Sequence, residues 1–353
     1  MRIALDATYS VGAELSGIGI YSRELLRSLP ALFPDDHFTA CLRWKQWLRR
    51  ESANHLPNLE TRLLQWPFAV GRANVFHALN QRADWRPAPA VVTTFHDLFV
   101  MTADYSTAAF RARFTEQARR AAERSDLIIA VSNFTASQVN EYLQVDRSRI
   151  RVIYHGVHRL SLELPGGAPE PVILFVGAIQ KRKNLLRLIE AFEQTGPEWR
   201  LVLAGSPNGY GAEAIHERIA RSPRRSSIEV IGYVDNRRLQ ELYATASIFA
   251  FPSLDEGFGI PILEAMLHGV PVVTSNRSGT AEVAGDAALL VNPENVEELA
   301  SALRRLAEDQ PLRQLLIKKG RERASEFSWS RAARATYQAY EEAVAGSVSE
   351  FRL

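Results

Sequence analysis

Residues 248–271 read IFAFPSLDEGFGIPILEAMLHGVP and contain, in succession, the signals of a strand, a loop and a helix. The apolar run Ile248–Phe251 predicts a buried strand. Pro261 suits the first helical position, where its missing N–H is not needed. Gly269 suits the position just after a helix end, and a proline follows two residues later. The pattern therefore predicts a strand, a glycine-containing loop and a short helix over about residues 261–268.

Two glutamates flank this loop. Glu256 comes before it, at the end of the strand, and Glu264 falls in the first turn of the expected helix. Gly257 and Gly259 lie between them, where the unpaired N–H groups of a helix N-terminus can meet an oxygen-rich ligand. Carboxylates accept hydrogen bonds from the hydroxyl groups of a sugar or a ribose. The arrangement predicts a ligand site, although acids at a helix N-terminus also occur simply because the helix dipole favours them.

The alternation of short apolar runs and amphipathic segments extends through the chain and predicts two doubly wound α/β domains with parallel sheets. Three prolines and two glycines in LPGGAPEP, residues 164–171, predict a linker between the domains. The strands expected before the linker are Ile3–Leu5, Val75–Ala78, Val91–Phe95, Leu127–Val131 and Arg151–Tyr154, and the helices are Tyr21–Leu29, Ala108–Glu123 and Ala136–Leu143. The strands expected after it are Val172–Val176, Arg200–Ala204, Ile228–Ile231, Ile248–Phe251, Pro271–Thr274 and Ala288–Val291, followed by helices Val296–Leu306, Leu312–Phe327 and Ser330–Val344.

The expected organisation is a first domain over residues 1–165, a second over 166–328, and a final helical segment over 329–353. In doubly wound sheets, ligands bind beyond the carboxyl ends of the strands. With two such domains facing each other, the cleft between them is the expected site.

Bulk composition excludes several classes of protein. The chain has 353 residues, 46% hydrophobic and 23% charged, which is ordinary for a globular protein, and its net charge of +2 is too small to indicate a nucleic-acid partner. A single cysteine, Cys41, excludes an intrachain disulfide and a cysteine-rich zinc site, and fits a reducing cytosol. The N-terminal apolar run stops at Asp6 and lacks the core of a signal peptide, and no run of 18 apolar residues occurs. We therefore expect a cytoplasmic protein.

Three further segments suit an anionic or polar ligand. Lys181–Lys183 places three cations in a row after a predicted strand, which suits a diphosphate, although such runs are often solvated loops. Gly17 and Gly19 follow the first strand, where glycine allows a ligand to approach the backbone. His96 ends another predicted strand; a single histidine is more often structural than catalytic, but its place at a strand end shifts the balance toward a functional role. Asp97 is a candidate to orient His96 or to contact a ligand. Residues 131–135, VSNFT, predict a helix cap.

The run EGFGIPILEAM, residues 256–266, resembles the E-x7-E motif of retaining glycosyltransferases of family 4, which have the GT-B fold. The resemblance extends from Met1 to about Tyr340 and is weakest over residues 39–73. It implies that Glu264 holds the ribose hydroxyls of a nucleotide-sugar donor and that Glu256 contacts the transferred sugar. The loop backbone would assist at Gly257, Phe258, Gly259 and Ile260.

The resemblance also assigns roles to the other segments. Lys183 and Arg182 would neutralise the donor diphosphate, and Arg182 would replace the arginine that many members carry after the glycine equivalent to Gly177, since this chain has Ala178 there. It implies that Gly17 and Gly19 face the diphosphate and that His96 approaches the donor sugar. The backbone at residues 232–234, including Val234, would contact the nucleobase. His155 replaces a common asparagine, and the helix after Phe327-Ser328-Trp329 would cross to the first domain and help to couple domain closure.

The expected function is transfer of a hexose, with retention, from a GDP- or UDP-linked donor to a hydroxyl of a carbohydrate, lipid-linked or small-molecule acceptor. GDP-mannose is the favoured donor, and no metal or other cofactor is needed if the cations neutralise the diphosphate. The alternatives are an epimerase or phosphorylase on the same architecture, or a nucleotide-sugar-binding protein without catalysis. The arginine-rich segment 108–124 suits peripheral contact with an anionic membrane, and equally suits a solvated helix.

Overall fold

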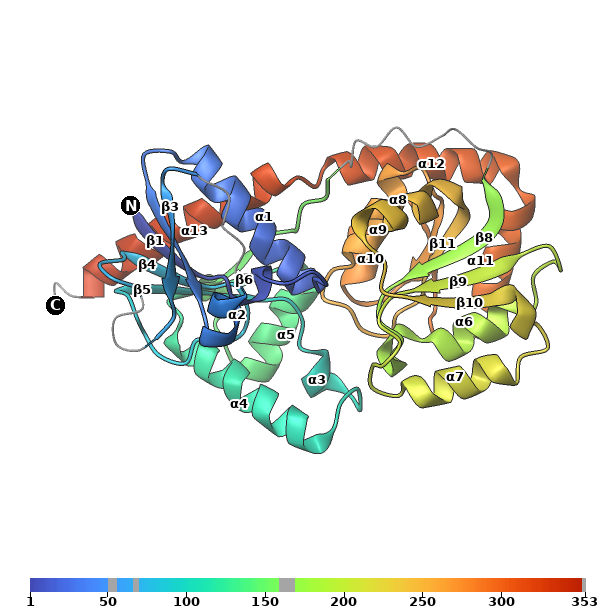
Figure 1. Cartoon of the computed structure of the whole chain (residues 1–353), viewed down its shortest axis with the longest axis horizontal. Helices are drawn as coiled ribbons and strands as arrows, with labels where there is room; N and C mark the ends of the chain where they lie inside the picture. Colours follow the sequence, from blue (N-terminus) through green and yellow to red (C-terminus); the bar gives the residue numbers. More distant parts are fainter. Residues whose placement is uncertain (50–55, 66–69, 159–168, 351–353) are drawn as a thin grey trace. The chain divides into compact units, whose positions relative to one another are not determined.

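The computed structural model describes residues 1–49, 56–65, 70–158 and 169–350, and Figure 1 traces the chain. The chain divides into two compact units. Unit 1 comprises Met1–Gly156 and Ser328–Leu353, and unit 2 comprises Val157–Phe327. Most of the expected linker, residues 164–168, lies outside the described residues, so that segment stays a prediction.

Unit 1 is built on a seven-stranded sheet in the order β3-β2-β1-β4-β5-β6-β7, and every neighbouring pair of strands is parallel. The order reverses between β1 and β4, so the chain leaves the two strands toward opposite edges. The strands are β1 (Arg2–Asp6), β2 (His37–Leu42), β3 (Leu59–Leu63), β4 (Val75–Ala78), β5 (Ala90–Phe95), β6 (Leu127–Ala130) and β7 (Ile150–Val152).

Helices cover both faces of this sheet because successive strand residues point to opposite sides. Ile3 and Leu5 of β1 belong to one core cluster, with residues of α1 (Gly17–Leu32) and α13 (Trp329–Glu350), whereas Ala4 belongs to another, with residues of α4 and α5. The remaining helices of this unit are α2 (Trp44–Leu48), α3 (Phe99–Thr102), α4 (Ala108–Arg124) and α5 (Asn133–Leu143).

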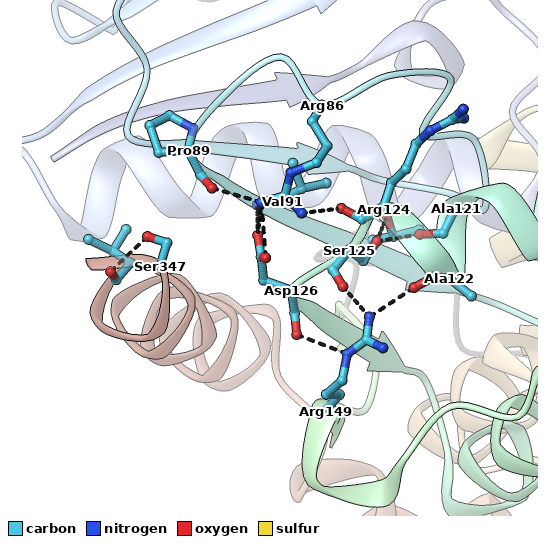
Figure 2. Close-up of polar contacts among 12 residues, drawn as sticks. Arg86, Pro89, Val91, Ala121, Ala122, Arg124, Ser125, Asp126, Arg149 and Ser347 are labelled. Carbon is cyan, nitrogen blue, oxygen red and sulfur yellow. Dashed lines mark hydrogen bonds and ion pairs between the residues drawn. The ribbon is translucent and has the colours of Figure 1, made fainter. Parts of the chain in front are cut away.

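Polar contacts hold the C-terminal end of α4 against the amino ends of β5 and β6 (Figure 2). The Arg149 guanidinium donates to the main-chain carbonyls of Ala122, at 2.9 Å, and Ser125. The Asp126 carboxylate pairs with Arg86 at 2.9 Å and accepts the N–H of Val91 at 2.7 Å. A cation that satisfies the last carbonyls of a helix fixes where that helix ends. The C-terminal end of α4 is therefore anchored at the amino edge of the sheet.

Unit 2 contains a six-stranded parallel sheet in the order β10-β9-β8-β11-β12-β13. Its order reverses between β8 and β11. The strands are β8 (Glu170–Val176), β9 (Arg200–Ala204), β10 (Ile228–Gly232), β11 (Ala246–Phe251), β12 (Val272–Ser275) and β13 (Leu289–Val291). The helices are α6 (Leu185–Phe192), α7 (Ala212–Ala220), α8 (Asn236–Thr245), α9 (Ile260–Leu267), α10 (Ser278–Ala284), α11 (Val296–Glu308) and α12 (Gln310–Ser325), labelled in Figure 1.

Two helices start earlier than the sequence pattern indicates. α9 begins at Ile260, so Glu264 is its fifth residue and opens the second turn, and the placement of Glu264 in the first turn is wrong. Gly259 adopts φ +109°, which lets the chain turn directly into the helix. α1 begins at Gly17 rather than near Tyr21, because Ser16 caps it by accepting the N–H of Gly19 at 3.3 Å.

Candidate active site

The switch point of the unit 2 sheet brings together the charged residues that follow β8 and β11. Lys183 ends a short 3-10 helix, η3 (Lys181–Lys183), seven residues after β8. Glu256 lies in the loop between β11 and α9, five residues beyond Phe251, and not at the strand end as expected. Because β8 and β11 are adjacent and parallel, both segments leave from the same edge of the sheet.

Glu256 binds both cations through one oxygen. Its Oε1 accepts from the Lys183 ammonium and lies 2.6 Å from the Arg182 guanidinium. Arg182 also donates to the carbonyl of Asp255 at 2.9 Å, and the Lys183 Nζ lies 4.6 Å from the centre of the Phe251 ring. Lys183 and Glu256 are buried, which rules out the solvated loop considered as an alternative for this cation. We call Arg182, Lys183 and Glu256 the charged triad.

The charged triad keeps Glu256 ionised. Burial alone would raise the pKa of this carboxyl, but the charges of Arg182 and Lys183 outweigh burial and lower it to about 2. Two cations and one carboxylate leave the triad with an excess positive charge. A preorganised positive site of this kind stabilises negative charge on a ligand.

Backbone contacts fix the two loops that carry the triad. Asn184 lies in the left-handed region at φ 61°, and its side-chain amide Nδ2 donates to the main-chain carbonyls of Pro252 at 3.0 Å and Pro293 at 2.6 Å. The N–H of Leu254 donates to the carbonyl of Arg182 at 2.8 Å. Because the loop after β8 is tied to the loop after β11, Lys183 and Glu256 are held in place before any ligand arrives.

The glycine-containing loop leads into α9. Its Glu256 carbonyl accepts the N–H of Gly279 at 2.8 Å. The side chain of Phe258 is buried and meets Phe327 edge-to-face at 5.9 Å, so this residue has only its backbone to offer a ligand. The expected backbone contacts from Gly257, Gly259 and Ile260 remain predictions, and the structure places all of these residues directly before or at the start of α9.

Glu264 has a partner that the sequence did not indicate. The Tyr243 hydroxyl, from α8, donates to Glu264 Oε2 at 2.9 Å, and the Tyr243 ring stacks on His268 with 5.1 Å between centres. Burial raises the pKa of Glu264, and the hydrogen bond from Tyr243 opposes that rise. Tyr243 therefore sets the direction in which this carboxyl points.

Two other expected donor-binding residues lie at the same carboxyl edge. Gly177 follows β8, and its N–H donates to the carbonyl of Ala204 at 2.8 Å. Val234 follows β10, two residues after Gly232. Parallel pairing of β8, β9 and β10 puts both segments on the side that carries the charged triad. Their contacts with a ligand stay predictions.

In unit 1, His96 lies at the carboxyl end of β5 and is buried. Its Nε2 is 2.9 Å from the carbonyl of Leu79. A carbonyl can only accept, so Nε2 carries the hydrogen, and burial lowers the pKa of His96 to about 4. At neutral pH the ring is therefore uncharged, with an acceptor lone pair on Nδ1. The proposed role of Asp97 in orienting His96 stays a prediction.

Aromatic and polar side chains surround His96. The Tyr21 ring meets it edge-on at 4.8 Å, and the His155 ring stacks on it at 5.3 Å. The Tyr21 hydroxyl lies 2.8 Å from that of Thr94, which is also 2.8 Å from His77 Nε2. His155, singled out only as a departure from the family pattern, is thus a neighbour of His96.

The remaining expected residues of unit 1 are helical. Gly17 and Gly19 form the first turn of α1 instead of a free loop, and the N–H of Gly19 is already used by the Ser16 cap. Ser132 caps α5 as expected, accepting from Thr135 at 3.0 Å. No helix within the described part of the chain combines the length and apolar character needed to span a membrane.

Comparison with known proteins agrees with this geometry. The family described as "Glycosyl transferases group 1" matches residues 164–323, and "Glycosyltransferase Family 4" matches residues 37–159. O-antigen chain mannosyltransferase B of Escherichia coli is 30% identical over 300 residues, which is 80% of this chain and 78% of that protein. The MMP alpha-(1->4)-mannosyltransferase of Mycolicibacterium hassiacum is 30% identical over 241 residues, 66% of this chain and 58% of that protein.

Solved structures show the same architecture. Sucrose-phosphate synthase from Thermosynechococcus elongatus matches with a TM-score of 0.78 at 23% identity, over 98% of this chain and 99% of that one. Anabaena Alr3699/HepE, in complex with UDP and glucose, matches with a TM-score of 0.74 at 19% identity, over 97% and 100%. These structures share the GT-B fold of two parallel-sheet α/β domains. The chain belongs to the group 1, family 4 glycosyltransferases, and it is a glycosyltransferase.

Proposed function

We propose that this glycosyltransferase moves mannose from a nucleotide-linked donor, with GDP-mannose favoured, to a hydroxyl acceptor, and that the new bond keeps the donor's anomeric configuration. The observation that carries the proposal is the charged triad at the switch point of unit 2, with Glu264 on the adjoining helix. The two similar proteins reported above are named mannosyltransferases, which supports mannose as the sugar.

In the proposed reaction, the bond between the sugar C1 and the diphosphate oxygen breaks, and the acceptor oxygen bonds to C1 from the same face. The acceptor's proton passes to the departing diphosphate, so atoms and charges balance. Lys183 and Arg182 stabilise the negative charge that develops on this diphosphate. The Glu256 carboxylate is the group proposed to accept a hydrogen bond from a sugar hydroxyl.

The other assigned residues bind and orient. Glu264 accepts hydrogen bonds from the ribose hydroxyls, in the orientation that Tyr243 imposes. The Nδ1 lone pair of neutral His96 accepts from a hydroxyl of the donor sugar. The fixed charges of Arg182 and Lys183 take the neutralising role that other transferases give to a metal ion.

A product assay tests the proposal. Purified protein is incubated with GDP-mannose, UDP-glucose or UDP-galactose and simple α-mannosides, and the product linkage is assigned by NMR from its one-bond C1–H1 coupling. An α-linked mannoside from GDP-mannose is expected. A β-linked product would overturn retention, an epimerised donor would identify an epimerase, and binding of nucleotide without transfer or hydrolysis would identify a binding protein.

Metal removal tests the role of the cations separately. If Lys183 and Arg182 neutralise the diphosphate, transfer in 5 mM EDTA, about a hundredfold above trace metal, should stay within about twofold of the untreated rate, since less than 0.5 kcal/mol of barrier is then at stake. Loss of activity in EDTA that returns with added Mg²⁺ or Mn²⁺ would contradict this. The measurement is the initial rate of GDP release.

A further inference from the structure

The unit 1 sheet has its own pocket at its own switch point. A cavity of about 450 Å³ opens where the chain leaves β1 and β4, the two strands between which the order reverses. Tyr9 lines it from the short 3-10 helix η1 (Thr8–Ser10) that follows β1, and Gln81 and Arg82 line it from the segment after β4. The first half of α4 closes it with Phe110, Arg113, Phe114 and Gln117. Doubly wound sheets bind ligands at this place.

The lining combines aromatic faces with guanidinium groups. Tyr9 and Phe110 are 38% and 41% exposed, so part of each ring is open to a ligand. The Arg113 guanidinium lies 5.4 Å from the centre of the Phe110 ring. An aromatic face is electron-rich and attracts the C–H groups of a pyranose ring, whereas guanidinium forks bind phosphate or carboxylate oxygens. The lining therefore matches a sugar that carries an anionic group.

Both arginines of this pocket have binding capacity to spare. Arg82 approaches Asp84 only at 4.0 Å, and Asp84 lies closer to Arg43, at 3.0 Å. Within the described residues, the buried Nε of Arg82 has no hydrogen-bond partner, and no carboxylate lies within 4.0 Å of Arg113. Arg82 is partly compensated, since its charge also lowers the pKa of Asp6, but its Nε keeps a hydrogen bond to offer a ligand oxygen. Arg113 has no such carboxylate beside it among the described residues, so its charge is available to an anionic ligand.

The segment after β4 links this pocket to His96. Leu79 supplies the carbonyl that His96 contacts, and Gln81 and Arg82 line the pocket. Between them, Asn80 is only 1% exposed, and neither atom of its amide has a hydrogen-bond partner in the part of the chain that the structure describes. Buried amides without partners are costly, so Asn80 marks a place where a bound polar group or water completes the structure.

We infer that this pocket holds the acceptor, and that the acceptor is a pyranose with an anionic oxyacid group, a phosphate in the first instance, beside the ring. The inference rests on the proposed glycosyl transfer and adds the acceptor class to it. Tyr9 and Phe110 contact the sugar face, Arg82 and Arg113 bind the phosphate, and the accepting hydroxyl points toward the side of the sheet edge that carries His96.

Binding of α-mannose 1-phosphate tests this inference, with methyl α-mannoside as the neutral comparison. Both are titrated by calorimetry in the presence of whichever of GDP or UDP raises the melting temperature, so that the donor site is filled. Arg82→Gln and Arg113→Gln should each weaken binding of the phosphate by at least about fivefold, the size of one charge-assisted contact of about 1 kcal/mol. Neither should change binding of the neutral glycoside, whereas Tyr9→Ala should weaken both.

Arg119→Gln is the matched control, because Arg119 is an exposed arginine on the same helix that does not line the pocket. It should bind both probes as the unaltered protein does. The inference would be overturned if the Arg82 and Arg113 variants bound α-mannose 1-phosphate as tightly as the unaltered protein. It would also be overturned if they lost equal affinity for the phosphate and for the neutral glycoside. An unchanged nucleotide-induced melting shift in each variant shows that the chain still folds.

Two further measurements distinguish this inference from the proposed function and from membrane binding. Slow hydrolysis of the donor in water reports the proposed function alone, so a protein that hydrolyses GDP-mannose but shows no selective loss of the phosphate probe keeps the function and loses this inference. Sedimentation with phosphatidylglycerol vesicles tests a membrane surface instead. If the arginine variants lose vesicle binding but keep the phosphate probe, the pocket serves lipid contact and not the acceptor.

Discussion

At the scale of single residues, Glu256 explains how the buried Lys183 and the half-buried Arg182 can lie side by side. Its Oε1 is shared by Lys183 and Arg182, and their charges hold its pKa near 2, so the carboxylate stays charged throughout the physiological range. Removal of one cation leaves Glu256 paired with the other. The same removal takes half of the positive charge from the site proposed for the diphosphate. Stability and catalysis should therefore respond differently to one substitution.

Lys183→Met should lower kcat/KM for transfer by at least about 100-fold, because one charged donor to a developing negative charge is worth about 3 kcal/mol. Its melting temperature should fall by only a few degrees, since Arg182 still compensates Glu256. Lys181→Met is the matched control, because Lys181 lies two residues away in η3 and is exposed. Near-normal turnover in Lys183→Met would contradict the role of this ammonium.

Tyr243→Phe should raise the donor KM by about tenfold, because the lost hydrogen bond to a carboxylate is worth about 1.5 kcal/mol. The kcat should change little if Tyr243 only orients Glu264 for ribose. Removal of the hydroxyl also raises the pKa of Glu264 further, so the donor KM of this variant should fall as the pH is raised and the carboxyl loses its proton. A kcat loss without any effect on KM would assign Tyr243 a different role.

Sequence separation decides which of these residues were predictable. Lys183 and Glu256 both follow parallel strands, and such residues converge at one edge, so both could be assigned to one donor site from the sequence. The hydrogen bond from Tyr243 to Glu264 depends on how α8 packs beside α9, and no periodic pattern reports that packing. The neighbours of His96 could not be predicted from the sequence either, because Tyr21 and His155 lie 134 residues apart in the chain.

At the scale of elements, the start of α9 depends on one glycine. Gly259 adopts φ +109°, and a Cβ there would lie 3.1 Å from the Ile262 side chain. The left-handed conformation brings Glu256 and the helix carrying Glu264 into their observed positions within a short loop. The helix start is therefore coupled to the geometry of the donor site.

Gly259→Ala should lower the free energy of unfolding of unit 2 by about 1–3 kcal/mol, the cost of holding a non-glycine residue at such an angle. Urea unfolding followed by far-UV circular dichroism measures this. The melting shift induced by nucleotide should shrink as well, because the loop moves. Gly12→Ala is a useful comparison, since its positive φ of +136° occurs in unit 1 with nothing within 4 Å of the added Cβ. A nucleotide shift that drops equally in both variants would contradict a local role for Gly259.

The missed strands show where sequence patterns lose power. The pattern predicted β4, β5 and β9 to within a residue, and β8 to within two, because these strands are internal to their sheets and apolar. It missed β2 and β3, which lie toward one edge, where HFTACL and LETRL mix polar with apolar residues. An edge strand needs only one buried face, so its composition resembles that of a loop.

At the scale of the whole molecule, the described part of unit 1 contains three buried histidines that cannot become charged without a cost in stability. Burial lowers the pKa of His77 to about 3 and of His96 to about 4, and it lowers that of His155 well below the usual value. In the unfolded chain these rings take up protons near pH 6.5, whereas in the folded unit they do so only at lower pH. The stability that the three uncharged histidines contribute is thus fully present above pH 6.5 and is lost as the pH falls.

The free energy of unfolding of unit 1 should therefore fall between pH 6.5 and pH 4, each histidine contributing up to about 1.4 kcal/mol per pH unit. Burial raises the pKa of Asp6, which opposes this trend, but one carboxyl does not offset three imidazoles. Urea titrations followed by tryptophan fluorescence measure the slope, since Trp329 is buried in unit 1. His77→Gln should reduce the slope by one histidine's share, whereas exposed His216→Gln should leave it unchanged. A stability independent of pH over this range would contradict the assignment.

The helix α13 has a consequence for how the protein is made. It supplies Trp329, Ala333 and Tyr340 to the core beneath β4, β5 and β6, and its Tyr340 hydroxyl lies 2.7 Å from His77 Nδ1. A ribosome releases residues 1–156 long before this helix exists, so the first half of the chain emerges with an uncovered apolar sheet face. Unit 2 is continuous in sequence and is complete by Phe327. Unit 2, although its synthesis begins later, should thus be the first to fold completely. Nascent chains halted before Trp329 should depend on chaperones to avoid aggregation.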